Sequence, residues 1–123
     1  MPKITKKDLL KETVKHVDIK KLNASPLIEA YSKMSFSSRD LARAAEIYNK
    51  MLADKKASVW LILAGSTSAG GCMDAYADMV RNNMIDVVVA TGASIVDMDF
   101  FEALGFKHYK GTPFIDDGLL RSL

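Results

Sequence analysis

The chain has 123 residues, of which 17 are basic and 15 acidic, for a net charge of +2, and 49% are apolar. This length allows one small domain, and the apolar content excludes a disordered chain. The near balance of charge favours neither nucleic acid nor a membrane surface as a partner. The single cysteine, Cys72, excludes an internal disulfide and is typical of the reducing cytoplasm, and no stretch resembles a signal peptide or a membrane span.

Residues 1–22 are predicted to form an N-terminal helix and a connector, and residues 23–123 the N-terminal half of a larger domain. Thr5 and Asp8 have the spacing of a capping box, and apolar residues follow at near-helical intervals. This pattern predicts a helix over about 5–17. The lysines of this region are interpreted as a solvated helix face, because acidic residues interleave with them.

A helical pattern continues after the connector. Pro26 can open a short helix at its first position, and Ser37 or Ser38 can cap a longer helix over about 39–53. Alanines on the apolar face of the longer helix predict close packing against a sheet.

The stretch Val59–Gly71 has the sequence VWLILAGSTSAGG. Its apolar first half predicts a strand over about 58–64, and its small, polar second half predicts a turn before a helix over about 72–83. Amide groups at a helix N-terminus carry partial positive charge, and small residues let a phosphate approach them closely. This unit favours a nucleotide site, although its spacing matches neither GxGxxG nor the P-loop. The alternative is a plain turn that binds nothing.

A second strand and turn repeat this arrangement. Residues 85–91 predict a strand, 91–94 a turn of small residues, and 95–104 a helix that Gly105 ends. The spacing of the two strands is that of a parallel crossover, and their apolar runs predict a sheet covered on both faces. Both turns would then lie at the carboxyl ends of the strands, where doubly wound sheets bind ligands.

The last residues predict only short elements. Residues 106–112 form either a third strand or an irregular edge, and 118–121 begin a short helix. Because two strands rarely make a stable sheet alone, further polypeptide is expected to complete it.

Several segments resemble deoxyhypusine synthase. They are Asn82–Asp86 (NNMID), Ala90–Asp97 (ATGASIVD), Phe100–Gly105 (FFEALG) and His108–Gly111 (HYKG), with Ser35-Phe36, Arg39–Ala44 and Leu63–Gly65 upstream. The resemblance runs from about Val17 to the last residue. It is closest to the bacterial and archaeal branch, which includes deoxyhypusine synthase-like proteins.

The resemblance implies an α/β, Rossmann-like NAD-binding fold with a doubly wound parallel sheet, of which this chain is the N-terminal half. It also implies a homo-oligomer, a tetramer built from tight dimers. In the family, NAD oxidises spermidine, an enzyme lysine takes up the butylamine group, and the group passes to a lysine of a translation factor precursor. Neither nucleic acid nor a membrane is an expected partner.

Cofactor-binding residues are implied in both turns. They are Gly65, Ser66, Thr67, Ser68 and Ala69 in the first turn, Thr91, Gly92 and Ala93 in the second, and Asp97 beyond it. Asp97 falls on a family acidic residue that contacts both NAD and the polyamine, and helix capping is the alternative. The alternative for the hydroxyls of the first turn is bonding to local backbone.

No catalytic residue and no metal ligand is assigned in this chain. The nucleophilic lysine and general-base histidine belong to the C-terminal half of the family, and neither His16 nor His108 matches that histidine. His108 is interpreted as a packing or surface residue, Trp60 as a core residue, and Cys72 as a small buried residue.

Three interpretations remain open. The chain is the N-terminal portion of a deoxyhypusine synthase, a non-catalytic binding or regulatory subunit that pairs with a companion chain, or part of a homospermidine synthase-like enzyme completed by a second chain. All three predict a dinucleotide crevice at the ends of the two strands.

Overall fold

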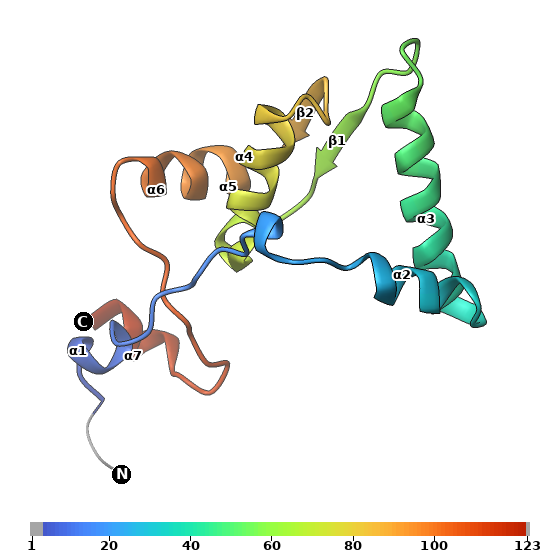
Figure 1. Cartoon of the computed structure of the whole chain (residues 1–123). Helices are drawn as coiled ribbons and strands as arrows, with labels where there is room; N and C mark the ends of the chain where they lie inside the picture. Colours follow the sequence, from blue (N-terminus) through green and yellow to red (C-terminus); the bar gives the residue numbers. More distant parts are fainter. Residues whose placement is uncertain (1–3, 123) are drawn as a thin grey trace.

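The computed structural model describes residues 4–122 and consists of helices and a two-stranded sheet (Figure 1). This arrangement confirms the α/β class. The elements in chain order are α1 (Lys6–Leu9), a 3₁₀ turn (Ile19–Lys21), α2 (Ser25–Ser32), α3 (Phe36–Ala53), β1 (Trp60–Leu63), a π-helical turn (Ser68–Cys72), α4 (Met73–Arg81), β2 (Val87–Ala90), α5 (Gly92–Ser94), a π-helical segment (Ile95–Phe100), α6 (Phe101–Ala103) and α7 (Asp117–Ser122).

The two strands are parallel, as their crossover spacing predicts. Trp60 lies opposite Val87 and Leu63 opposite Ala90, so both strands end at the same edge of the sheet. Each strand is shorter than its apolar run, because ladder hydrogen bonds form only where the two chains lie in register. The carboxylate of Asp86 accepts the Val59 amide at 2.7 Å and closes the opposite edge.

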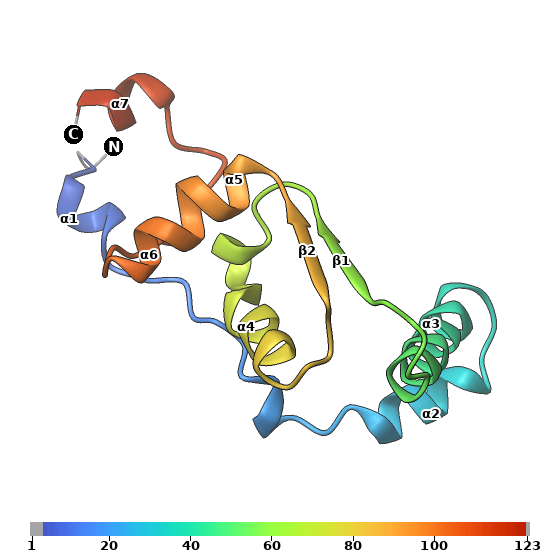
Figure 2. The same ribbon diagram turned by 90° about the horizontal axis from the view of Figure 1, so that it is seen from above.

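Helices cover only one face of this sheet. Figure 2 shows α4 and the α5–α6 stretch on the same side of β1 and β2. On the other face Trp60 is 59% exposed and Ile62 is 72% exposed. Within residues 4–122, the predictions of a sheet covered on both faces and of a buried Trp60 are therefore wrong.

Helix α3 packs against α2 rather than against the sheet (Figures 1 and 2). It begins one residue after Ser35, not after Ser37 or Ser38. Only Ala42 of the helix is buried. One link to the sheet is a hydrogen bond from Tyr48 Oη to the Met84 carbonyl at 2.9 Å. The expected packing of the alanine face against the sheet is therefore wrong.

The predicted helix over 5–17 is also wrong beyond its first turn. The Thr5–Asp8 capping box forms, but α1 ends at Leu9. Residues 12–21, called here the N-terminal strap, are extended up to Asp18 and then form the 3₁₀ turn. The Val14 amide donates to the His108 carbonyl at 2.9 Å, so backbone pairing with a distant segment replaces helical hydrogen bonds.

The same pairing decides the structure of residues 106–112. They form no third strand but a single antiparallel bridge, Thr13 with Tyr109. The predicted helix over 95–104 is part of a longer helical stretch that begins at Gly92. We expect Ile95, Phe101 and Leu104 to form its buried face from their spacing, but they are 47%, 43% and 60% exposed, so this expectation is wrong.

The chain exposes much more surface than a globular protein of its size. Its accessible area is 9762 Å², whereas a folded monomer of 13.5 kDa exposes roughly 6,500 Å². Among the described residues, the buried apolar side chains are those of Ala42, Val59 and Ile85 only. Within residues 4–122, no helix is long and apolar enough to cross a membrane.

The open sheet face generates a prediction about association. Because exposed apolar strands seek partners, the isolated chain should self-associate in sedimentation velocity experiments. Replacing both Trp60 and Ile62 by Thr should shift it toward monomer, whereas Lys33→Gln, at the exposed residue that follows α2, should not. A chain that sediments as a monomer at every concentration would contradict this expectation.

Candidate functional site

The two turns of small residues meet at the carboxyl edge of the sheet. The Ser94 hydroxyl, at the end of α5, donates a hydrogen bond to the Gly65 carbonyl, directly after β1. Ser94 is completely buried. Ser94-Ile95-Val96-Asp97 also has the form of a capping box, but no such box forms, because the Ser94 hydroxyl bonds to the neighbouring turn and not to its own helix.

The first turn contains a backbone conformation that favours glycine. Gly65 has φ +68°, in the left-handed region that residues other than glycine rarely adopt. A β-carbon at this position would meet no atom within 4 Å, so the space in front of the turn is open. Glycine is therefore required by the backbone angle and not by a close neighbour.

The hydroxyls of the first turn have different environments. Ser66 and Thr67 are exposed, and Thr67 Oγ1 accepts a hydrogen bond from Tyr76 Oη at 2.9 Å. Ser68 is completely buried, and its hydroxyl has no hydrogen-bond partner among residues 4–122. Ala69 is half-buried. The hydroxyl side chains that this turn presents to solvent are therefore those of Ser66 and Thr67.

The second turn presents small residues at the same edge. Thr91 and Gly92 are exposed, and Ala93 is half-buried. The Thr91 carbonyl accepts the amides of Ser94 and Ile95 and starts the helical stretch. A β-carbon on Gly92 would also meet no atom within 4 Å.

Two acidic residues follow the second turn with different surroundings. Asp97 is exposed and does not cap a helix, and the described chain offers its carboxylate no hydrogen-bond partner. Asp99 lines a small apolar pocket between the sheet and α4, and its Oδ1 is buried without a partner in the same residues.

A histidine–glutamate–histidine cluster lies behind the turns, and sequence reasoning missed it. Glu102 Oε1 lies 2.7 Å from His16 Nε2, and Oε2 lies 3.1 Å from His108 Nδ1. The side chains of Glu102 and His16 are 17% and 11% exposed. His16 comes from the N-terminal strap, so the cluster joins two parts of the chain that are distant in sequence. His108 is therefore more than the packing or surface residue that was predicted.

The cluster changes the acidity of its carboxyl group. Burial raises the pKa of Glu102, whereas the hydrogen bonds from His16 and His108 lower it, and the net pKa lies below its usual range. Glu102 is therefore ionised at neutral pH and only accepts hydrogen bonds. His16 Nε2 and His108 Nδ1 are then both donors.

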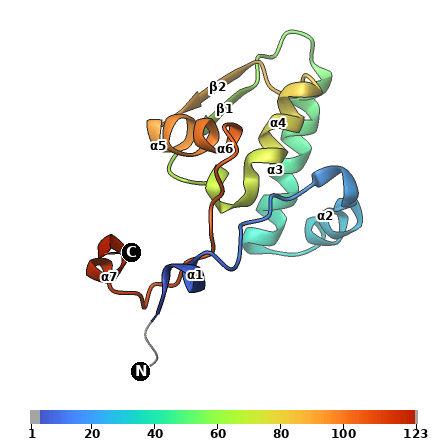
Figure 3. The same cartoon turned by 90° about the vertical axis from the view of Figure 1, so that its left-hand side faces the viewer.

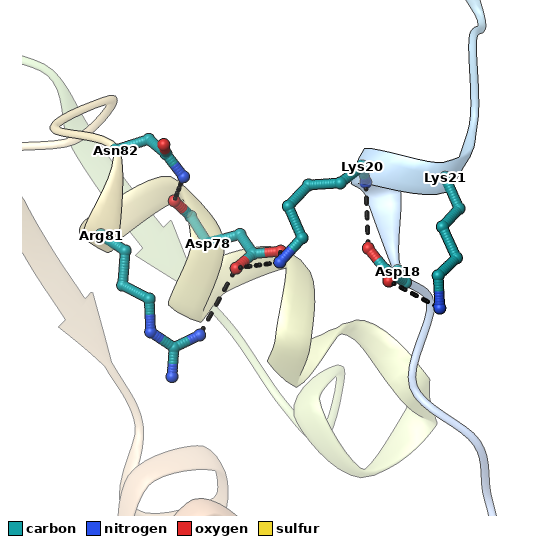
Figure 4. Close-up of polar contacts among 6 residues, drawn as sticks. All are labelled: Asp18, Lys20, Lys21, Asp78, Arg81 and Asn82. Atoms are coloured by element: carbon teal, nitrogen blue, oxygen red, sulfur yellow. Dashed lines mark hydrogen bonds and ion pairs between the residues drawn. The ribbon is translucent and has the colours of Figure 1, made fainter.

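A second buried carboxylate holds the other end of the strap. Asp78 on α4 has a side chain only 7% exposed, and Lys20 Nζ lies 2.9 Å from its Oδ2. Arg81 Nη1 approaches Oδ1 at 3.4 Å. Figure 4 shows the carboxylate between these two cations. The hydrogen bond with Asp78 holds the pKa of Lys20 above its usual range.

Cys72 and the acidic residues form no further reactive cluster in the described part of the chain. Cys72 is a free thiol and is half-buried, where full burial was expected. No group of three or more His, Cys, Asp or Glu in residues 4–122 is placed to hold a metal ion.

The lowered pKa of Glu102 generates a prediction about pH. The carboxyl of Glu102 titrates lower in the folded than in the unfolded chain, so its hydrogen bonds stabilise the fold above the ordinary value of 4.5 and are lost as pH falls below it. Glu102→Gln should lower the free energy of unfolding above pH 4.5, and the difference from the unaltered chain should shrink in more acidic solution.

Thermal unfolding followed by circular dichroism measures this difference. Glu29→Gln is the matched control, because Glu29 and its partner Lys33 are both exposed on α2. The control should differ little from the unaltered chain at any pH. An effect of Glu102→Gln that does not shrink below pH 4.5 would contradict the assignment.

Comparison with known proteins places the chain in a family. The family model described as Deoxyhypusine synthase matches residues 26–123. A deoxyhypusine synthase-like protein of Caulobacter vibrioides is 65% identical over 98% of this chain and 33% of its own length, and one of Coxiella burnetii is 62% identical over all of this chain and 35% of its own.

A more distant relative is named a probable deoxyhypusine synthase. It comes from Methanosarcina thermophila and is 38% identical over 84% of this chain and 32% of its own length. The chain thus spans about a third of the length of the curated relatives it matches. No solved structure matches it. The family match, which covers most of the residues, shows that this chain belongs to the deoxyhypusine synthase family.

Proposed function

We propose that the chain forms the N-terminal part of the NAD site of a deoxyhypusine synthase-like transferase. The observation that carries this proposal is the junction of the two turns, where Ser94 bonds to the Gly65 carbonyl at the carboxyl edge of a parallel sheet. Dinucleotides bind at that edge in doubly wound sheets. The two-stranded sheet would be the start of the larger Rossmann-like sheet.

The residues of both turns fit a dinucleotide. Open space lies in front of Gly65 and Gly92, which lets a pyrophosphate approach the backbone. The exposed hydroxyls of Ser66 and Thr67 can donate hydrogen bonds to phosphate oxygens, while buried Ser68 and half-buried Ala69 shape the turn from inside. Thr91, Gly92 and Ala93 would hold the other part of the cofactor. When bound, NAD supplies a hydride acceptor.

Asp97 is the proposed contact for the polyamine. Its carboxylate is exposed one helical turn beyond the second turn of small residues, and the described chain gives it no partner. An exposed carboxylate can pair with an ammonium group of spermidine and hold the neighbouring carbon toward the nicotinamide. The acceptor lysine of the translation factor precursor would then receive the butylamine group.

The exposed surface supports completion of this site by further polypeptide. The chain exposes about 3,200 Å² more than a globular protein of its mass, and a standard interface covers only about 800 Å² on each partner. A longer chain of the family, in a homo-oligomer, would cover the open sheet face and supply the nucleophilic lysine. A companion chain that carries the missing half is the alternative.

The left-handed angle of Gly65 generates a test of the NAD site. Gly65→Ala would strain the backbone by about 1–2 kcal/mol in that conformation, so relaxation of the turn should weaken NAD binding roughly fivefold to thirtyfold. Gly70→Ala is the matched control, because Gly70 has equally open space without the left-handed angle.

Isothermal titration calorimetry with NAD measures both variants against the unaltered chain. The proposal expects Gly70→Ala to bind within about twofold of the unaltered chain, since a methyl group fits there without strain. Equal affinity of all three chains would remove the first turn from the site, and the absence of NAD binding by the unaltered chain would contradict a preformed half-site.

A further inference from the structure

The N-terminal strap lies across the back of the first turn. The Val17 amide donates to the Gly71 carbonyl at 2.9 Å, at the end of the π-helical turn that follows Ser66 and Thr67. Figures 2 and 3 show this segment passing α4 and the end of α6 on its way to α2. The strap is thus in direct contact with the segment that enters α4.

Gly71 shows how close this contact is. It is buried, and its φ is +110°. A β-carbon there would lie 3.1 Å from the Lys15 carbonyl oxygen and 3.8 Å from a methyl of Val14. The backbone of the strap therefore occupies the space in which a side chain at Gly71 would sit, and neither segment can move toward the other.

The strap is held by polar contacts on both sides of Gly71. On the N-terminal side of the Val17–Gly71 contact, His16 bonds to Glu102, which also binds His108. The Lys110 amide donates to the Glu12 carbonyl at 2.8 Å. On the C-terminal side of that contact, Lys20 pairs with buried Asp78. Glu102 belongs to the helical stretch that follows the second turn, and Asp78 to α4, which follows the first.

We infer that the strap is a positioning device that joins the helices behind the two turns, with Glu102 acting through His16, and Asp78 acting through Lys20. Because the strap abuts Gly71, these anchors fix the backbone of the first turn and its distance from the second. The consequence for the cofactor rests on the proposed NAD site: a loosened strap leaves the turn in several conformations, so part of the binding energy is spent on ordering it.

Variants at Lys20 test one anchor without disturbing the core, because the Lys20 side chain is 64% exposed. Lys20→Gln removes the cation, and Lys20→Arg keeps one that can still pair with Asp78. Lys33→Gln removes the lysine of an exposed pair on α2 and is the matched control. Glu102→Gln tests the other anchor, because an amide cannot accept from both imidazoles.

Two readouts separate this inference from the proposed function. Amide hydrogen exchange, which needs no cofactor, should speed up roughly tenfold at Val17 and across residues 66–72 in Lys20→Gln and Glu102→Gln, since each loses a charged hydrogen bond. Lys20→Arg should restore slow exchange, and Lys33→Gln should not change it. NAD affinity should fall in the same two variants and recover in Lys20→Arg.

Each outcome decides a separate point. Unchanged exchange across residues 66–72 in both anchor variants would overturn the inference, and so would faster exchange at this turn with unchanged NAD affinity. If the unaltered chain binds no NAD while the anchor variants still loosen the turn, the positioning role of the strap is supported and the proposed function fails.

Discussion

One hydrogen bond, from the Ser94 hydroxyl to the Gly65 carbonyl, brings the functional parts of this chain together. Its donor Ser94 is completely buried, and the bond joins the turn after β1 to the helical stretch after β2. A Ser94 hydroxyl left buried without this partner would cost about 1–3 kcal/mol, so the two turns are favoured to stay in contact. Parallel pairing of the strands places both turns at one edge, and this bond then fixes them as one surface.

Local sequence patterns predicted the two strand–turn–helix units well. Apolar runs ending in glycine and small hydroxyl residues specify such units over short distances, so β1, α4 and β2 lie within a few residues of their predicted bounds. The prediction of a helix over 5–17 was wrong because contacts between distant segments decided the structure there. The apolar spacing of Val14 and Val17 suits an extended strap equally well, and pairing with His108 and Gly71 decided between the two structures.

Burial and the cluster at Glu102 could not be predicted from local patterns. An apolar run indicates that Trp60 and Ile62 can be buried, but not what packs against them, and both are exposed in residues 4–122. His16 and Glu102 are 86 positions apart and carry no shared motif, so only the folded chain brings them together. The candidate site on Gly65–Ala69, Thr91–Ala93 and Asp97 came from family resemblance joined to these local units, and it stays a proposal.

The central claim is that the two turns form one dinucleotide surface. Titration of NAD into the ¹⁵N-labelled chain, followed by amide chemical shifts, tests this claim most directly. The amides of Gly65–Ala69 and Thr91–Ala93 should shift together with a single dissociation constant, while those of α2 stay in place. Shifts confined to one turn, or shifts of α2 instead of the two turns, would contradict it.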